Sequence, residues 1–135
     1  MTVVIDASAL VAALVDDGPD GRWAESLLTA ELAAPYLLPV EVASVLRRAA
    51  TAGEISDDVA SLAHADLQDL RITWFPYGHV AQRIWELRHD LTPYDAWYVS
   101  IAELLDAPLA TLDRRIANAP GTTCRFRTPD EPESS

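Results

Sequence analysis

The sequence predicts an α/β fold, a three-layer sandwich in which helices flank a mainly parallel central sheet. The main observation is that short apolar or β-branched runs alternate with longer segments of helical periodicity, so that a helical segment separates each strand candidate from the next. The chain has 135 residues, of which 50% are hydrophobic, a size and composition that suit one core and leave no room for a second domain. We expect one folded domain over residues 1–127 and an acidic, disordered tail over residues 128–135.

The first elements are expected to be a strand, a helix, a turn, a second helix and a very short strand. The opening run is β-branched, the sequence DDGPDG has turn composition, and the spacing of Trp and Leu that follows is helical up to a proline. In chain order these elements lie at residues 2–5, 8–14, 16–21, 23–32 and 36–38.

Two helices and a strand follow. Pro39 stands at a favourable first position for a helix, and Gly53 supplies its C-terminal stop. Ser56 is a suitable N-cap for the next helix, which extends to Leu70. A strand is then expected over residues 72–75, closed by a proline.

The last third contains an explicit helix start. A helix is expected over residues 79–89, and then the sequence TPYD supplies an N-cap threonine, a first-turn proline and an acid. We expect the helix that begins there to be followed by a strand over residues 109–112, a helical turn over 114–117 and a final strand over 124–127.

The charge of the chain excludes several classes of function. Asp and Glu number 21 against 10 basic residues, so the formal charge is −11 and broad coating of nucleic acid by counterion release is disfavoured. A local basic patch remains compatible with a nucleic-acid substrate. All the basic residues are arginine, which excludes Schiff-base catalysis, the phosphate-binding-loop lysine and the lysine of phospho-aspartate receiver folds.

Cysteine content and the N-terminal sequence predict a cytoplasmic location. Cys124 is the single cysteine, so the chain forms no internal disulfide. The start, MTVVIDASAL, has no basic region and reaches an acid after a short apolar run, so we expect neither a signal peptide nor a contact with the membrane.

Four carboxylates from four distant segments are expected to converge. Each lies at a strand end or in a first helical turn, and in right-handed βαβ units these positions share one edge of the sheet. Carboxylates gathered in this way raise one another's pKa, and a divalent cation relieves their repulsion. The four residues are Asp6, Glu41, Asp95 and Asp113.

An all-carboxylate site suits Mg²⁺ or Mn²⁺, whereas zinc would be expected to bring His or Cys ligands. Such a site supports phosphodiester hydrolysis with water as the nucleophile. Each acid also has a purely structural interpretation. Asp6 and Asp113 can be N-caps. Glu41 can interact favourably with the helix dipole, and Asp95 can complete a capping box with Thr92.

Three segments carry a resemblance to a known family. The sequences VVIDASAL, LPVEVASVLRRA and LTPYDAWYVSIAELLDAPLATLDRRIA are similar to the acidic motifs of PIN-domain ribonucleases, specifically the VapC-like toxins of bacterial toxin–antitoxin pairs. The resemblance implies that the four carboxylates form the metal-binding and catalytic set. Ser8 and Thr111 match hydroxyl residues near the first and last acids and are expected at the substrate. Asn118 stands near where some relatives carry a further acid.

The resemblance also implies partners: an RNA substrate such as tRNA or rRNA, a second copy of the chain, and a small antitoxin with an arginine that engages the carboxylates. Arginines that flank the acids are expected to contact RNA phosphates, with a solvated helix face as the alternative. They are Arg47, Arg48, Arg114 and Arg115.

The sequence thus predicts a divalent-metal-dependent endoribonuclease, the toxin of a toxin–antitoxin pair. The alternative is a catalytically silent module of the same fold that binds a protein or RNA partner. A receiver or phosphatase with Asp6 as phospho-acceptor is disfavoured, because Ser8 stands where a second acid is needed and the chain has no lysine. Of Trp97 and Tyr98, which lie on different sides of a helix, only one can face the site; base stacking and packing in the core or at a dimer contact remain open.

Overall fold

The centre of the molecule is a parallel sheet of five strands in the order β3-β2-β1-β4-β5. The computed structural model describes residues 1–129. Strand β1 is central and pairs with β2 on one side and with β4 on the other. This arrangement confirms the expected α/β class and the parallel sheet. The strands are β1 (Thr2–Ile5), β2 (Glu31–Pro35), β3 (Ile72–Phe75), β4 (Leu109–Ala110) and β5 (Phe126–Arg127).

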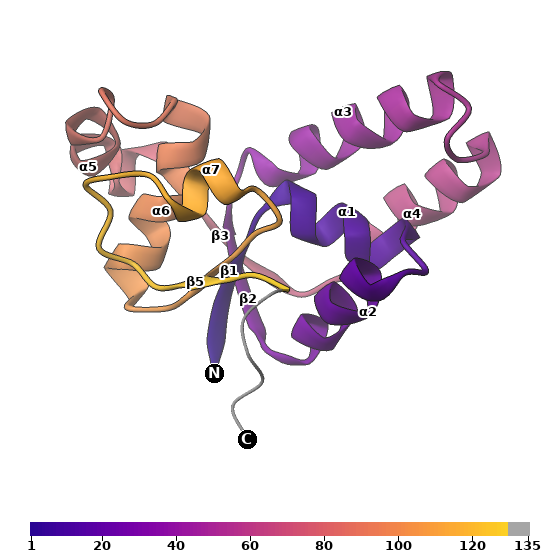
Figure 1. The fold of residues 1–135 in the computed structure, drawn as a ribbon, viewed down its shortest axis with the longest axis horizontal. Coiled ribbons are helices and arrows are strands. Elements are labelled where there is room, and N and C mark those ends of the chain that lie inside the picture. The colour runs from indigo at the N-terminus through magenta and orange to yellow at the C-terminus, as the bar shows by residue number, and fades with distance from the viewer. Residues whose placement is uncertain (130–135) are drawn as a thin grey trace.

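Helices cover both faces of this sheet (Figure 1). One layer holds the first four helices and the other holds the last three, so the three-layer sandwich is also confirmed. The helices are α1 (Ala7–Val15), α2 (Pro19–Ser26), α3 (Leu38–Thr51), α4 (Asp57–Asp69), α5 (Ala81–Glu86), α6 (Pro93–Leu105) and α7 (Arg114–Ala117), with two 3-10 turns, η1 (Leu27–Thr29) and η2 (Tyr77–His79). No helix within residues 1–129 is long and apolar enough to cross a bilayer.

Local signals in the sequence set several helix ends. Ser56 accepts a hydrogen bond from the amide of Val59 at the start of α4, and Thr92 accepts one from the amide of Asp95 at the start of α6. Gly53, with φ of +76°, follows α3 in the left-handed conformation that glycine adopts without strain. These ends lie where the sequence predicted them.

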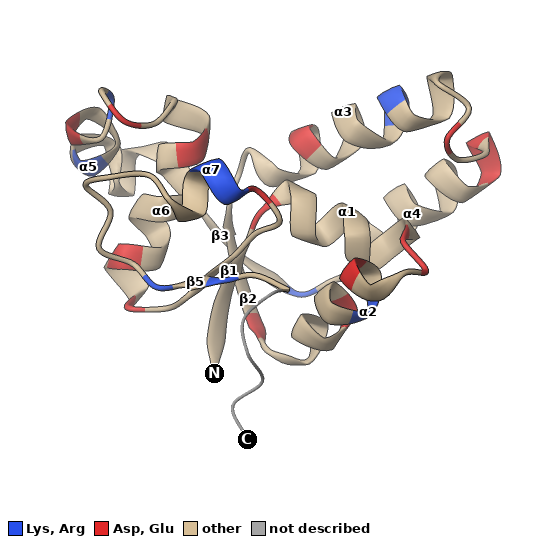
Figure 2. Cartoon of the chain, in the orientation of Figure 1, with Lys and Arg blue, Asp and Glu red and all other residues tan. Residues whose placement is uncertain are grey.

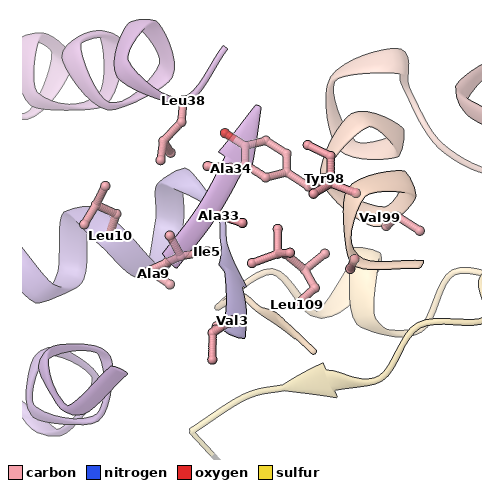
Figure 3. Packing of buried hydrophobic residues seen from close by; sticks show 14 of the residues in the cluster. Val3, Ile5, Ala9, Leu10, Ala33, Ala34, Leu38, Tyr98, Val99 and Leu109 are labelled. Carbon is pink, nitrogen blue, oxygen red and sulfur yellow. The ribbon is translucent and has the colours of Figure 1, made fainter. Parts of the chain in front are cut away.

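The core lies between the sheet and the helices on both of its faces. Val3, Val4 and Ile5 of β1 are fully buried, as expected for a central parallel strand covered on both sides. Figure 3 shows the ring of Tyr98 extending from α6 toward β2 and the start of α3, with its hydroxyl oxygen at the far end. The core therefore reaches the edge of the sheet where α1, α3 and α6 begin.

The second helix and the second strand were predicted in the wrong places. Helix α2 ends at Ser26, and β2 occupies residues 31–35, where the sequence predicted helix up to Pro35 and a strand over 36–38. The segment ELAAP has the alanines of a helix, but it pairs with β1 on one side and with β3 on the other, so tertiary pairing overrides propensity.

Three other elements are shorter than predicted. The helix expected over residues 79–89 is reduced to η2 and the six-residue α5, and the last two strands have two residues each. Residues 130–135 of the expected tail lie outside the described part of the chain.

Candidate active site

All four predicted carboxylates line one pocket of about 310 Å³, which we call the acidic pocket. It lies at the carboxyl ends of β1 and β4, where the chain order of the sheet changes direction, the usual position of a ligand site in an open parallel sheet. Figure 2 shows acidic segments after β1, in α3, at the start of α6 and before α7, with the basic start of α7 beside them. The pocket is lined by Asp6, Ala7, Ser8, Glu41, Arg48, Asp95, Tyr98, Asp113, Arg115 and Ile116.

Asp6 is the buried base of the pocket. It is the N-cap of α1 and its side chain is only slightly exposed. Its Oδ1 accepts hydrogen bonds from the Ser8 hydroxyl at 2.7 Å and the Ala9 amide at 3.0 Å, and its Oδ2 accepts one from the Thr111 hydroxyl. Burial raises the pKa of Asp6; these hydrogen bonds oppose the rise, and the nearby charge of Asp113 adds to it.

Ser8 and Thr111 connect the first acid to the loop that carries the last. The Ser8 Oγ accepts from the amide of Leu112 at 3.0 Å, and the Thr111 Oγ1 accepts from the amide of Asp113 at 2.9 Å. Both hydroxyl groups therefore act as donor and acceptor within the protein. Their contact with a substrate stays a prediction, while their role in joining β1 to the loop after β4 is evident from the geometry.

Glu41 and Asp95 lie in the first turns of α3 and α6 and are half-buried. Burial raises the pKa of Glu41, and the charges of Asp95 and Asp6 raise it further. Burial also raises the pKa of Asp95, and the charge of Asp113 adds to the increase. Each of the four carboxylates thus acts electrostatically on at least one of the others, which is the signature expected of convergent acids.

Asp113 differs from the other three because it has a cationic partner. It is the N-cap of α7, and the Arg115 guanidinium donates to both of its carboxylate oxygens. The hydrogen bond from Arg115 is the main reason that the pKa of Asp113 lies below its usual value. The fourth carboxylate is therefore ionised and already neutralised within the chain.

The four predicted arginines divide into two pairs. Arg48 and Arg115 line the acidic pocket, whereas Arg47 and Arg114 are exposed on the same helices but are not part of its lining. Asn118 is exposed at the end of α7 and also lies outside the lining. RNA contacts by the arginines stay a prediction.

The chemistry of the donor set fits a hard divalent cation. The pocket offers carboxylates and hydroxyl groups and no His or Cys, the set that Mg²⁺ and Mn²⁺ prefer. Within residues 1–129, no three acidic, His or Cys side chains are close enough to form a ready-made metal cage. Mg²⁺ commonly binds through one or two carboxylates and keeps several waters, so a spread set of acids is compatible with it.

Structural roles expected for the acids are present too. Asp6 and Asp113 do cap α1 and α7, and Asp95 is paired through its amide with the capping Thr92. Capping uses part of the hydrogen-bonding capacity of the Asp6 and Asp113 carboxylates and does not explain why all four acids share a pocket.

Tyr98 is a member of the site that sequence reasoning missed. We expected base stacking or packing for it; the ring packs in the core, and the hydroxyl donates to Oε1 of Glu41 at 2.6 Å. The available signal was its position three residues after Asp95, which places both side chains on one face of α6.

Comparison with known proteins assigns the fold to a family. The PIN domain family model matches residues 3–121, so the chain belongs to the PIN domain family. Ribonuclease VapC1 of Mycobacterium tuberculosis is 40% identical over 126 residues, which cover 92% of this chain and 95% of that protein.

Solved structures agree with this assignment. PAE2754 of Pyrobaculum aerophilum superposes with a TM-score of 0.69 at 25% identity, covering 93% of this chain and 83% of that one. VapBC-1 of nontypeable Haemophilus influenzae superposes with a TM-score of 0.60 at 14% identity, covering 97% and 100%. The resemblance to PIN-domain ribonucleases seen in the sequence is confirmed.

Proposed function

We propose that this protein is a divalent-metal-dependent endoribonuclease and the toxin of a toxin–antitoxin pair. The observation that carries the proposal is the meeting of four carboxylates, from residues 6 to 113, around one pocket at the edge of a PIN fold. The similarity to Ribonuclease VapC1 over nearly the whole of both chains supports the same activity.

The four carboxylates would hold Mg²⁺ or Mn²⁺ in the acidic pocket. When bound, such an ion lowers the pKa of water and offsets charge on the scissile phosphate and leaving oxygen. The chain supplies the placement: the hydroxyl groups of Ser8 and Thr111 fix the Asp6 carboxylate, and the exposed guanidinium groups of Arg48 and Arg115 bind flanking phosphates. Cleavage by water requires no covalent enzyme intermediate.

The proposal includes partners and a location. The substrate is structured RNA such as tRNA or rRNA, the protein works as a cytoplasmic homodimer, and a small antitoxin lays an arginine across the acidic pocket. An arginine guanidinium can bind a carboxylate through two parallel hydrogen bonds, in place of a hydrated cation. The pair of Arg115 and Asp113 within this chain is an example. The shared fold with VapBC-1 supports an antitoxin partner.

A catalytically silent PIN-fold module is the second candidate. The observation in its favour is that two of the acids already serve as helix caps, and that no ready-made metal cage exists in residues 1–129. Such a module would bind its partner without needing a metal and would cut nothing.

Cleavage of total tRNA and rRNA by the purified protein separates these functions. We expect cleavage with Mg²⁺ or Mn²⁺, none with EDTA, and none by Asp95→Asn. Asp58→Asn is the matched control, because Asp58 is also a first-turn acid, on α4, but lies outside the pocket lining. Cleavage that persists in EDTA or in Asp95→Asn would contradict the proposal, and an inactive wild type that still binds RNA or antitoxin would favour the silent module.

A further inference from the structure

The buried phenol of Tyr98 has one polar contact. Tyr98 is 2% exposed, and within the described residues its hydroxyl bonds to Glu41 Oε1 alone, at 2.6 Å and across 57 positions of sequence. A buried phenolic hydroxyl needs a partner, and a carboxylate offers only acceptors, so Tyr98 is the donor.

The contact fixes one oxygen of Glu41 and leaves the other available. In residues 1–129, no other side chain or amide donates to the Glu41 carboxylate. With Oε1 held against the core, the side chain loses the rotamer freedom of an exposed glutamate, and Oε2 remains the oxygen that can bind a ligand in the acidic pocket.

The same helix carries a second pocket acid. Asp95 and Tyr98 lie three residues apart on α6, and both line the acidic pocket. Helix α6 packs on β1 and β2, so its position is set by the core rather than by a surface loop. One rigid helix therefore places Asp95 directly and Glu41 through the phenol.

We propose that Tyr98 is a positioning residue, which clamps Oε1 of Glu41 so that Oε2 is presented to the divalent cation alongside Asp95. This inference rests on the proposed metal site. A group that orients a metal ligand from outside the coordination shell typically raises metal affinity by roughly ten- to a hundredfold. It does so without touching the metal or the substrate.

Tyr98→Phe tests the clamp, because it removes one oxygen and keeps the ring that fills the core. We expect about tenfold weaker binding of Mn²⁺ to the metal-free protein in titration calorimetry, with the fold retained in thermal melting. With RNA as substrate, kcat at limiting Mn²⁺ should fall while KM for RNA is unchanged, and saturating Mn²⁺ should restore cleavage. Loss that Mn²⁺ does not restore would mean that the hydroxyl serves structure only and would overturn the proposal.

Tyr77→Phe is the matched control, since Tyr77 lies outside the acidic pocket and its ring packs edge-on against Trp97. Its Mn²⁺ affinity should equal that of the wild type. In a Glu41→Gln background, Tyr98→Phe should cause no further loss; a further tenfold loss would show that Tyr98 does not act through Glu41.

The positioning role of Tyr98 and the proposed metal site are overturned by different results. If the wild type binds Mn²⁺ and Tyr98→Phe binds it equally well, the positioning role is wrong and the proposed nuclease stands. If the wild type binds no Mn²⁺, the proposed metal site and the clamp are both overturned.

Discussion

The guanidinium of Arg115 spans the carboxylate of Asp113, with Nη2 2.9 Å from Oδ2 and Nε 3.3 Å from Oδ1. The two residues are neighbours at the start of α7, and the Arg115 side chain is 88% exposed while that of Asp113 is 24% exposed. An exposed arginine contributes little to stability, but here it occupies both oxygens of a proposed metal ligand. The chain thus carries its own cation at the acidic pocket, and we expect that cation to compete with a divalent metal ion for Asp113.

Arg115→Ala should therefore tighten Mn²⁺ binding. Removing the guanidinium frees Oδ2 of Asp113, leaves Oδ1 with its bond from the backbone amide of residue 115, and deletes a positive charge that also acts on Asp95, so a several-fold gain in affinity is expected. Calorimetric titration of the metal-free protein measures it. Arg22→Ala, at a residue that bonds to the Asp17 carbonyl away from the pocket, should leave the affinity unchanged. Equal or weaker binding by Arg115→Ala would show that the pair does not compete with metal.

RNA binding should distinguish two adjacent arginines of α3. Arg48 lines the acidic pocket and Arg47 does not, although both are exposed. In the non-cleaving Asp95→Asn protein, Arg48→Ala should weaken RNA binding and make the slope of log affinity against log salt shallower by about one unit. Arg47→Ala should have the smaller effect. Equal losses would place the RNA along the whole exposed face of α3.

The stability of the metal-free protein should depend on Asp95 in a predictable direction. Because burial and Asp113 raise the pKa of Asp95 above 3.8, the folded state holds its proton more tightly than the unfolded state does. Its contribution is most favourable at low pH and is lost as the pH rises through the raised pKa. Asp95→Asn should thus leave the free energy of unfolding at pH 7 unchanged or raise it by up to about 0.5 kcal/mol. The loss of stability between acid and neutral pH should also be smaller in this variant than in the wild type.

Asp58→Asn supplies the contrast in the same melting experiment. Its carboxylate lies in the first turn of α4, where it interacts favourably with the helix dipole, so its loss should lower stability slightly. A large loss of stability in Asp95→Asn would instead mean that Asp95 is mainly a structural acid.

An antitoxin peptide that carries an arginine should compete with the divalent ion. Both are attracted by the same excess of negative charge in the acidic pocket, so each ligand should lower the affinity of the other by the same factor. Peptide affinity, measured across a Mg²⁺ titration at constant ionic strength, should fall as Mg²⁺ rises. An affinity independent of Mg²⁺ would show that the peptide binds outside the carboxylates.

Much of the fold and most of the site could be predicted from the sequence, because the residues that start each helix agree with the topology of a parallel sheet. The sequence TPYD starts α6 where predicted, and the topology of parallel sheets brings Asp6 and Asp113 to one edge without any contact being known in advance. The position of β2 was predicted wrongly, because its alanines match helix periodicity and its strand conformation depends on pairing with residues far along the chain.

The contacts that organise the site were also beyond sequence reasoning. The partner of Glu41 is Tyr98, and nothing in the composition of either helix links them; only the fold, which brings the two side chains within hydrogen-bond distance, does. Arg115 was expected to face RNA, and its pairing with Asp113 depends on side-chain rotamers that spacing alone does not specify.

The hydrogen bond between Asp6 and Thr111 joins residues that are 105 positions apart, and this separation has a consequence during synthesis. A ribosome makes β1 first and β4 near the end. A growing chain therefore lacks the Thr111 hydroxyl that holds the first carboxylate, and lacks the fourth carboxylate altogether, until β4 and the residues directly after it have emerged and β4 has paired with β1. For the ribonuclease proposed above, this order of synthesis means that an incomplete polypeptide has no assembled site with which to cut RNA, and that the earliest moment of activity is set by the synthesis of β4 and the residues directly after it.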